Sequence, residues 1–372
     1  MWSLSFLDKF LQPSENFEHP ETKRRLYNLL AATELLDSLN QIKPRKITEE
    51  ELLRFHTQRY IDHVKAVSDS DQGGDVGNHA MISHGGYDIA RLSAGGCLEA
   101  LDRVMHGDVS NAYCLVRPPG HHAEADGGMG FCIFNNIVLT TRHAQQVHGV
   151  KKIAIVDWDV HHGNGGQKAF WEEDEVLMIS IHQKDNYPRP SGNLGERGAG
   201  KGFGYNLNIP LPPGCGNGAY RAAFERVIVP ALNAFKPDLL LISCGYDPCV
   251  WDPLGQTLVC APEFGFWTEL MKKVADEHCK GRLMLLHEGG YSKEMVPFCG
   301  LFAIEALCGV STGVKDPFAH LYQLGGHDLE PHQDELISKC EVFVTDLLRL
   351  EAEKRPLEQT PASEQKETNS SS

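Results

Sequence analysis

The sequence lacks the features that mark several large classes of protein. No run of 18 apolar residues occurs, so we expect no membrane-spanning helix. The first ten residues carry no basic cluster, and Asp8 and Lys9 interrupt their mildly apolar character, so we expect no signal peptide. Positive charge is also scarce, because 35 lysines and arginines stand against 50 aspartates and glutamates, a formal charge of −15. We therefore expect no direct binding to nucleic acid, which needs clustered cations.

Cysteine is present but lacks the patterns that would give it a structural or metal-binding role. The chain has 11 cysteines, an odd number, and no Cys-x-x-Cys pair. These features argue against a disulfide framework and against a zinc site built from thiolates. We interpret the cysteines as small buried residues of a protein in a reducing compartment. This predicts a cytoplasmic location, or also a nuclear one in a eukaryote.

Five apolar segments predict the strands of one sheet. Their centres are continuous apolar runs rather than alternating ones, a pattern typical of strands buried on both faces of a parallel sheet. Segments with a helical spacing of apolar residues lie between them. We therefore predict an α/β fold, a single domain whose central, mostly parallel sheet is flanked by helices. The predicted strands are 110–116, 152–159, 175–182, 238–247 and 282–288, and the predicted helices are 133–148, 217–235, 262–279 and 293–307.

Residues that bear chemistry follow four of these strands. Ligands of open parallel sheets bind beyond the carboxyl ends of the strands, so we expect these residues at one edge of the sheet. The segments are Arg117-Pro-Pro-Gly-His-His-Ala123, Asp157-Trp-Asp-Val-His-His-Gly-Asn164, Ser243-Cys-Gly-Tyr-Asp247 and His287-Glu-Gly-Gly-Tyr291. Their convergence predicts an active site more strongly than any one segment does alone.

Two of these strand ends together predict a metal site. Asp159 and His161 lie two residues apart, so in an extended segment their side chains point to the same side. Asp247, at another strand end, supplies a third ligand. Three nitrogen and oxygen ligands with one open position are typical of catalytic zinc. The alternative is that Asp159 and His161 only cap the next helix or satisfy hydrogen bonds of the loop.

The adjacent His121 and His122 predict acid–base catalysis, as general base and general acid. Each imidazole needs an acceptor to orient its far nitrogen. Asp157 and Asn164, one charged and one neutral, are suitable acceptors that would separate the two pKa values. Tyr291 could donate its hydroxyl to a developing oxyanion. The alternatives are a simple turn for the two histidines and turn packing for the tyrosine.

Together with Gly130-Phe-Cys-Ile-Phe-Asn-Asn136, these motifs resemble the zinc-dependent histone deacetylase family, in the same order and over residues 19 to 309. Trp158, and Asn164 where other members carry aspartate, resemble the class II branch, which includes the bacterial histone deacetylase-like amidohydrolases. The resemblance implies an α/β domain of the arginase and deacetylase type. It also implies that Asp159, His161 and Asp247 bind zinc, with one ion per subunit.

The resemblance implies roles for further residues. His121 and His122 would do the acid–base work, and Tyr291 would polarise the acetyl carbonyl. Structural K⁺ or Na⁺ would bind at an inner site formed by Asp157, Asp159, His161, Ser180 and Ile181, and at an outer site formed by Phe170, Val176 and Tyr205. Substrate contacts would come from Gly130, Phe131, Tyr187, Leu254 and Gly289. Arg25 would match the arginine of an internal acetate channel.

The chain divides into three predicted parts. Residues 19–350 form the deacetylase catalytic domain. Residues 1–18 are atypical, because the family's domain normally opens with a short strand before the segment that begins at His19. Residues 351–372 are polar, contain no aromatic residue and are predicted to be a disordered tail. We also predict long functional loops at 78–86 and 186–204.

These observations predict hydrolysis of N-acyl-lysine amides in histones or other proteins, and they leave a homo-oligomer open. One alternative is an acetylpolyamine or small acyl-amine amidohydrolase of the same superfamily, which would place glutamate where Leu254 stands. A catalytically silent acetyl-lysine-binding scaffold is the alternative from another class, and the retained Tyr291 argues against it. A two-metal arginase-like site would need aspartate in place of Gly163. Residues 195–201 resemble a phosphate-binding loop, but they precede a strand-like segment rather than a helix.

Overall fold

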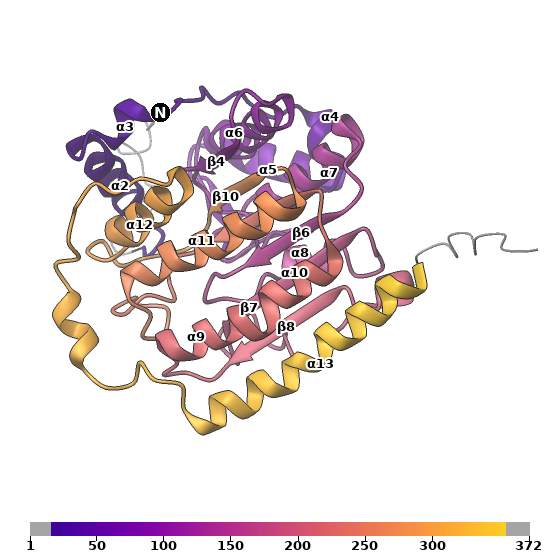
Figure 1. Ribbon diagram of the computed structural model, residues 1–372. Helices are drawn as coiled ribbons and strands as arrows, with labels where there is room; N and C mark the ends of the chain where they lie inside the picture. Colours follow the sequence, from indigo (N-terminus) through magenta and orange to yellow (C-terminus); the bar gives the residue numbers. More distant parts are fainter. Residues whose placement is uncertain (1–15, 355–372) are drawn as a thin grey trace, which may run out of the picture.

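The computed structural model describes residues 16–354 and contains a central six-stranded sheet (Figure 1). Along the sheet the strands follow the order β4-β10-β9-β6-β7-β8. Every neighbouring pair is parallel, which confirms the predicted class of fold. The strands are β4 (Asn111–Cys114), β6 (Ile153–Asp157), β7 (Val176–Gln183), β8 (Asn206–Leu211), β9 (Leu239–Cys244) and β10 (Leu283–His287).

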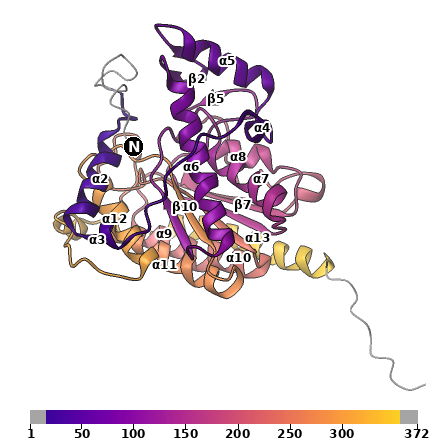
Figure 2. The ribbon, with the colours of Figure 1, turned by 90° about the horizontal axis from the view of Figure 1, so that it is seen from above.

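Helices cover both faces of the sheet, so its central strands are buried at every position. Figure 2 shows α6 (Gly86–His106) and α7 (Asn136–His148) on one side of the sheet, where their apolar residues pack against alternate residues of β6, β9 and β10. The other alternate residues pack beneath α9 (Asn217–Ala223), α10 (Val229–Phe235), α11 (Ala261–His278), α12 (Val296–Cys308) and α13 (Pro331–Lys354). This arrangement leaves the carboxyl ends of the strands as the place where polar residues gather.

The N-terminal part adds elements that we did not predict from the sequence. Helix α2 (Glu21–Ala32) packs on α12 through leucines and an isoleucine, and the short α3 (Leu35–Ser38) follows it. Helices α4 (Glu49–Leu52) and α5 (Gln58–Asp69) precede the long α6. The short strands β1 (Gly74–Asp75) and β3 (Met81–Ile82) pair antiparallel, and β2 (Gly77–Asn78) pairs in parallel with β5 (Gly128–Met129). The predicted loop 78–86 is therefore a compact β-rich segment, whereas 186–204 is irregular apart from a 3₁₀ turn at Gly200–Gly202.

The predicted helix 217–235 is not continuous. Helix α9 ends at Ala223, a π-helical turn occupies Phe224–Ile228, and α10 begins at Val229. Pro230 lies in the first turn of α10 and has no backbone N–H to donate, so the hydrogen-bond pattern changes before it.

The predicted disordered tail begins too early. Helix α13 continues to Lys354, so residues 351–354 are helical. The reason is Glu351, which is buried: its Oε1 accepts a hydrogen bond from the Tyr205 hydroxyl at 2.8 Å, and its Oε2 accepts one from Lys152 Nζ at 2.5 Å. The remainder of the predicted tail, and residues 1–15 of the predicted N-terminal segment, lie outside the described residues.

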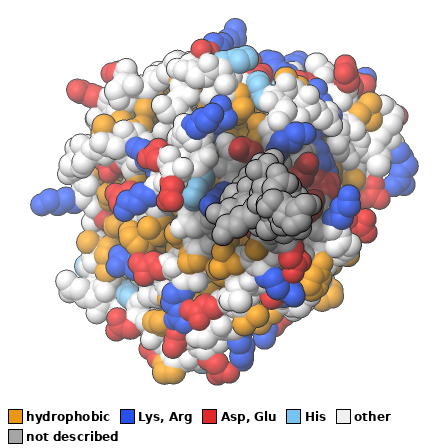
Figure 3. All heavy atoms as spheres, turned by 45° about the vertical axis from the view of Figure 1, so that its right-hand side comes forward, with side chains coloured by type: hydrophobic (Ala, Val, Ile, Leu, Met, Phe, Trp, Pro, Cys, Tyr) orange, Lys and Arg blue, Asp and Glu red, His pale blue; other side chains and the backbone are white. Residues whose placement is uncertain are grey.

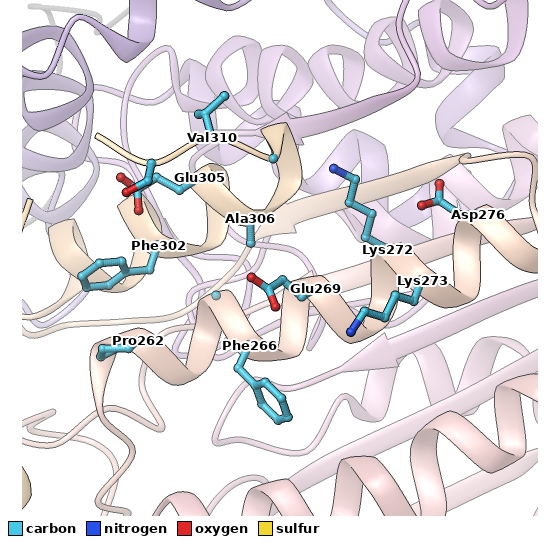
Figure 4. A pocket seen from close by; sticks show the side chains of 13 residues that line it. Pro262, Phe266, Glu269, Lys272, Lys273, Asp276, Phe302, Glu305, Ala306 and Val310 are labelled. Carbon is cyan, nitrogen blue, oxygen red and sulfur yellow. The ribbon is translucent and has the colours of Figure 1, made fainter. Parts of the chain in front are cut away.

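Two surface features complete the description. Positive and negative side chains are interspersed over the face seen in Figure 3. A groove of about 700 Å³ runs between α11 and α12, with Phe266, Glu269 and Lys272 among its lining residues (Figure 4). None of the predicted site residues lines this groove.

Within residues 16–354, no helix is both long enough and apolar enough to cross a membrane.

Candidate active site

The predicted site residues converge at the carboxyl ends of the strands. Asp159 follows β6 by two residues, Asp247 follows β9 by three, and Tyr291 follows β10 by four. His121 and His122 lie in the turn between β4 and β5. All five side chains are buried, although the motifs that carry them are far apart in the sequence. The sheet order places β10, β9 and β6 side by side, which brings these motifs together.

Asp159, His161 and Asp247 form a compact cluster whose ligand atoms all lie within 4.8 Å of one another. His161 Nδ1 lies 2.9 Å from Asp159 Oδ1 and 3.0 Å from Asp247 Oδ2. Asp247 Oδ2 is buried and accepts no hydrogen bond of normal geometry. The other oxygens are held by the main chain, because Val160 N–H donates to Asp247 Oδ1 at 2.8 Å and Gly289 N–H donates to Asp159 Oδ2 at 2.9 Å. Two fixed carboxylates and one imidazole fit a divalent cation such as Zn²⁺.

The charges of the cluster also favour a cation. Burial and the neighbouring charge of Asp159 raise the pKa of Asp247 to about 8. Burial would raise the pKa of Asp159 as well, but the charges of His121 and His161 hold it well below its ordinary value. Burial would lower the pKa of His161, yet Asp247 and Asp159 raise it to about 10. Two buried carboxylates this close cannot both carry free negative charge, so the pocket needs protons or a metal ion between them.

The two adjacent histidines have the predicted acceptors. His121 Nδ1 lies 3.0 Å from Asp157 Oδ2, and His122 Nδ1 lies 2.8 Å from Asn164 Oδ1. Burial would lower the pKa of His121, but Asp159 and Asp157 raise it well above the ordinary value. Burial and the charges of His121 and His161 lower the pKa of His122 well below it. The surroundings therefore favour a charge on His121 and oppose one on His122, and the two ring centroids lie 3.9 Å apart.

Tyr291 lies near the cluster, with its ring close to those of His161 and Phe131. Its ring centroid lies 6.4 Å from that of His161 and 5.8 Å from that of Phe131. Burial, together with the carboxylates of Asp247 and Asp159, raises the pKa of Tyr291 well above its ordinary value, so the phenol stays a hydrogen-bond donor. Gly290 precedes it with a φ of +118°, a conformation that favours glycine.

Three of the predicted substrate contacts surround His122. A Cβ at Gly130 would lie 2.5 Å from His122 Cδ2 and 2.8 Å from Tyr187 Cε1, so only glycine fits there. The rings of His122 and Tyr187 meet edge to face at a centroid distance of 5.0 Å. Phe131 has a φ of +69°, an unusual conformation for a residue with a side chain. The ring of Tyr187 thus lies against His122, and those of Phe131 and Tyr291 lie against each other beside His161.

Leu254 and Gly289 hold different positions relative to the site. Leu254 is half-buried, and its carbonyl accepts a hydrogen bond from the Asn186 side chain at 3.0 Å, which ties it to the loop that carries Tyr187. Gly289 lies directly against the cluster of Asp159, His161 and Asp247. A Cβ at this position would come within 2.3 Å of Asp247 Oδ2 and 2.6 Å of Asp159 Oδ2.

The residues predicted to bind monovalent cations lie near strands β6, β7 and β8. Asp157 is paired with Ser180 across β6 and β7, and Asp157 Oδ1 accepts a hydrogen bond from Asp159 N–H at 3.1 Å. Ile181 follows within β7. Phe170 directly follows α8 (Asn164–Ala169), Val176 is the first residue of β7, and Tyr205 directly precedes β8. Phe170 and Val176 have no polar side-chain atom, so a cation at the outer position would have to bind main-chain carbonyl groups.

Arg25 does not occupy the predicted internal position. Its side chain is 44 % exposed and lies near Glu21 and Glu294 at the surface. The buried cation of this helix is Lys23, whose Nζ donates to the Glu288 carbonyl at 3.4 Å and lies 3.6 Å from Glu18 Oε1. Residues two apart on a helix point about 200° away from each other, so the inward position of Lys23 turns Arg25 to the solvent.

Two buried carboxylates outside the predicted set hold the site's turns. Glu288 Oε2 accepts hydrogen bonds from Gly120 N–H at 2.6 Å and His121 N–H at 3.1 Å. Burial raises the pKa of Glu288 to about 7. Asp252 accepts three main-chain hydrogen bonds from the segments of Leu254 and Tyr291, and burial raises its pKa to about 6. Glu288 lies within a quoted motif and Asp252 five residues after one, but the sequence gave no signal of these contacts.

A second group of His and Asp residues is an ion-pair network rather than a metal site. His143 Nδ1 lies 2.6 Å from Arg54 Nη1, and because arginine always donates, this ring nitrogen is the acceptor. His143 Nε2 contacts Asp102 Oδ1 at 2.9 Å, and His148 Nε2 contacts the same oxygen at 2.7 Å. Burial would raise the pKa of Asp102, but these hydrogen bonds lower it to about 2. Both nitrogens of His143 and Nε2 of His148 thus already have partners within this network.

Comparison with known proteins supports the family resemblance that the motifs indicated. A family model described as "Histone deacetylase domain" matches residues 16–307. A histone deacetylase-like amidohydrolase from Pseudomonas aeruginosa is 44% identical over 307 residues, which cover 82% of this chain and 80% of the relative. A probable deacetylase from Archaeoglobus fulgidus is 35% identical over 352 residues, covering 93% and 96%. The crystal structure of the HDA15 HD domain matches with a TM-score of 0.79 and 30% identity, covering 92% of this chain and 94% of that chain.

Proposed function

Because the chain belongs to the histone deacetylase family and is a hydrolase of that family, we propose that it hydrolyses N-acetyl-lysine amides of histones or other proteins with the help of zinc. The observation that carries this proposal is the convergence of three groups on one buried point. These groups are the Asp159, His161 and Asp247 cluster, the differently protonated histidine pair, and the Tyr291 hydroxyl.

We assign the metal site to Asp159, His161 and Asp247. Zn²⁺ held there would act as a Lewis acid toward the amide carbonyl and lower the pKa of the attacking water. The main-chain hydrogen bonds from Val160 and Gly289 orient the carboxylates, so the chain supplies a preformed set of ligands. We further propose that K⁺ or Na⁺ binds near Asp157 and Ser180 and supports this edge of the sheet.

The histidine pair divides the proton transfers. His122 is neutral, and its Nδ1–H is directed at the Asn164 side-chain oxygen, so its Nε2 lone pair is free to accept a proton from the attacking water. His121 is kept charged by Asp157 and Asp159 and can donate a proton to the leaving lysine amine. The Tyr291 hydroxyl, whose pKa is raised and whose ring lies near His161, can donate to the oxygen on which negative charge develops.

The aromatic residues around the histidines fit a thin, extended acyl-lysine stem. Phe131, Tyr187 and Tyr291 present ring faces and edges, and Gly130 removes the side chain that would block His122. Leu254 provides an apolar rather than an acidic wall. A cationic polyamine backbone would be favoured by a negative charge at that position, so Leu254 favours acyl-lysine peptides.

The replacement Tyr291→Phe tests this proposal. Loss of the oxyanion donor should lower kcat about 10²- to 10³-fold on an acetyl-lysine peptide. Tyr322→Phe is the matched control, since it removes a buried hydroxyl that has no hydrogen-bond partner and should leave the rate unchanged. Steady-state kinetics on the peptide and on N-acetylpolyamines measure both effects.

Each outcome of these assays has a distinct meaning. Peptide turnover that falls in Tyr291→Phe supports the lysine deacetylase. A higher kcat/KM for the polyamines would replace it with the small acyl-amine amidohydrolase. The absence of turnover on either substrate by the zinc-loaded protein would favour the silent acetyl-lysine-binding scaffold.

A further inference from the structure

A buried aspartate outside the metal cluster joins two segments of the active site. Asp252 is 6 % exposed and lies between β9 and α11. Its Oδ2 accepts hydrogen bonds from Tyr291 N–H at 2.7 Å and Ser292 N–H at 3.2 Å. Its Oδ1 accepts one from Leu254 N–H at 2.9 Å. One carboxylate therefore holds the main chain at Tyr291, the proposed oxyanion donor, and the main chain at Leu254, the proposed apolar wall of the substrate channel.

Only a carboxylate can accept all three of these hydrogen bonds. Both oxygens of an ionised carboxylate are acceptors, whereas an asparagine amide has one acceptor oxygen and one donor nitrogen. In Asp252→Asn the NH₂ group would face either Leu254 N–H or the pair of N–H groups at Tyr291 and Ser292. One of the two segments would then lose its anchor, although the side chain keeps its size.

The turn before Tyr291 has two other main-chain hydrogen bonds, both at Gly289, whose N–H donates to Asp159 Oδ2 at 2.9 Å. Gly289 and Gly290 precede it without Cβ atoms, and Gly290 has a φ of +118°. The Gly289 carbonyl accepts one hydrogen bond from Tyr246 N–H at 3.0 Å. The contact of the Tyr291 ring with Phe131 is an edge contact at a centroid distance of 5.8 Å. The hydrogen bonds to Asp252 are those made by the main chain of Tyr291 itself and of Ser292, after the flexible Gly289-Gly290 pair.

We propose that Asp252 is a positioning residue that fixes the Tyr291 hydroxyl over the reacting carbonyl and couples it to the channel wall at Leu254. This inference rests on the proposed role of Tyr291. Asp252 itself touches no reacting atom, because its three hydrogen bonds all go to main-chain N–H groups.

A double-mutant cycle tests the proposal. Asp252→Asn should lower kcat on an acetyl-lysine peptide about 10- to 100-fold, since small misplacements of a catalytic group have effects of this size. In the Tyr291→Phe background, the same change should lower kcat less than about twofold, because no hydroxyl is left to position. Zinc content, measured on each purified variant, should stay at the wild-type stoichiometry.

Glu305→Gln is the matched control. Glu305 is also a buried carboxylate that accepts a main-chain hydrogen bond, from Thr312 N–H at 2.6 Å, but it lies at the far end of α12. Its replacement should leave kcat unchanged. If Asp252→Asn does not fold, Asp252→Ser, whose shorter side chain cannot bridge the two segments, takes its place in the cycle.

The outcomes separate this inference from the proposed function. An equal loss of kcat in the wild-type and Tyr291→Phe backgrounds would overturn the positioning role and leave the function intact. Loss of zinc in Asp252→Asn would also overturn it, because the residue would then act on the metal cluster. Full activity of Tyr291→Phe would overturn both the oxyanion role and the inference. A loss confined to the background with an intact Tyr291 supports the proposal.

Discussion

At the scale of single residues, the geometry of the Asp159, His161 and Asp247 cluster depends on the absence of a side chain at Gly289. Gly289 brings its N–H to Asp159 Oδ2 and leaves room for Asp247 Oδ2. A Cβ would lie 2.3 Å from Asp247 Oδ2 and 2.6 Å from Asp159 Oδ2, and both carboxylates are buried, so they could yield only by leaving their present positions. The glycine is thus part of the ligand geometry even though it supplies no ligand atom.

We predict that Gly289→Ala lowers zinc content and activity together, because the added methyl group displaces both carboxylates. Metal analysis of the purified variant and peptide kinetics measure the two effects. Gly325→Ala, at a position with no atom within 4 Å of the added Cβ, should change neither. Stoichiometric zinc in Gly289→Ala would show that the carboxylates are not the ligands.

At the scale of elements, Glu351 anchors the C-terminal end of α13 to the sheet, beyond the apolar residues by which the helix packs on the core. Glu351 accepts a hydrogen bond from the Tyr205 hydroxyl, next to β8, and pairs with Lys152, next to β6. Both contacts are partly or fully buried, so solvent screens them less than it screens a surface pair. The end of the helix is therefore part of the domain.

Glu351→Ala should lower the free energy of unfolding by about 1–3 kcal/mol, because it leaves the buried Tyr205 hydroxyl without its acceptor. Urea denaturation measures this change. The control is Glu353→Ala, which removes an exposed carboxylate of the same helix and should have an effect below about 0.5 kcal/mol. Equal effects of the two changes would contradict the anchoring role.

The elements show what sequence patterns could predict. The predicted strands match β4, β6, β7, β9 and β10 because continuous apolar runs are characteristic of strands buried on both faces. Helices α2, α5 and α6 were missed, and the break before Pro230 was not expected. Among site residues, the spacing of the motifs predicted which side chains follow the strands. It could not predict Lys23 in place of Arg25 or the contacts of Asp252, because these depend on how distant segments pack.

At the scale of the whole molecule, the proposed metal site of Asp159, His161 and Asp247 joins the ends of the middle strands of the sheet. Its carboxylates follow β6 and β9, and the Gly289 N–H that supports them follows β10. Without a cation, buried negative charges face one another at this point, and the raised pKa of Asp247, caused by burial and Asp159, reflects this cost. Metal binding should therefore stabilise the entire domain.

Removal of zinc with a chelator should lower the thermal midpoint of unfolding, and added Zn²⁺ should restore it. Binding at 100 times the dissociation constant corresponds to about 2.7 kcal/mol of stabilisation. Calorimetry of the chelated and reloaded protein measures the difference, and Gly289→Ala, which is expected to bind zinc poorly, should show a smaller shift. A midpoint that does not respond to zinc in the wild-type protein would contradict a metal site at the centre of the sheet.

The order of the strands also bears on protein synthesis. Gly289 N–H and Asp159 Oδ2 meet across 130 residues of chain, and β10 inserts between β4 and β9 rather than adding to an edge. During translation, the histidine pair and the first two proposed metal ligands, Asp159 and His161, therefore leave the ribosome long before β10. The segment that follows β10 completes the pocket. Translation that stops before β10 leaves a sheet with a central gap and no tyrosine donor. A prematurely terminated product is thus expected to be inactive, and it exposes apolar strand surface of the kind that chaperones and proteases bind.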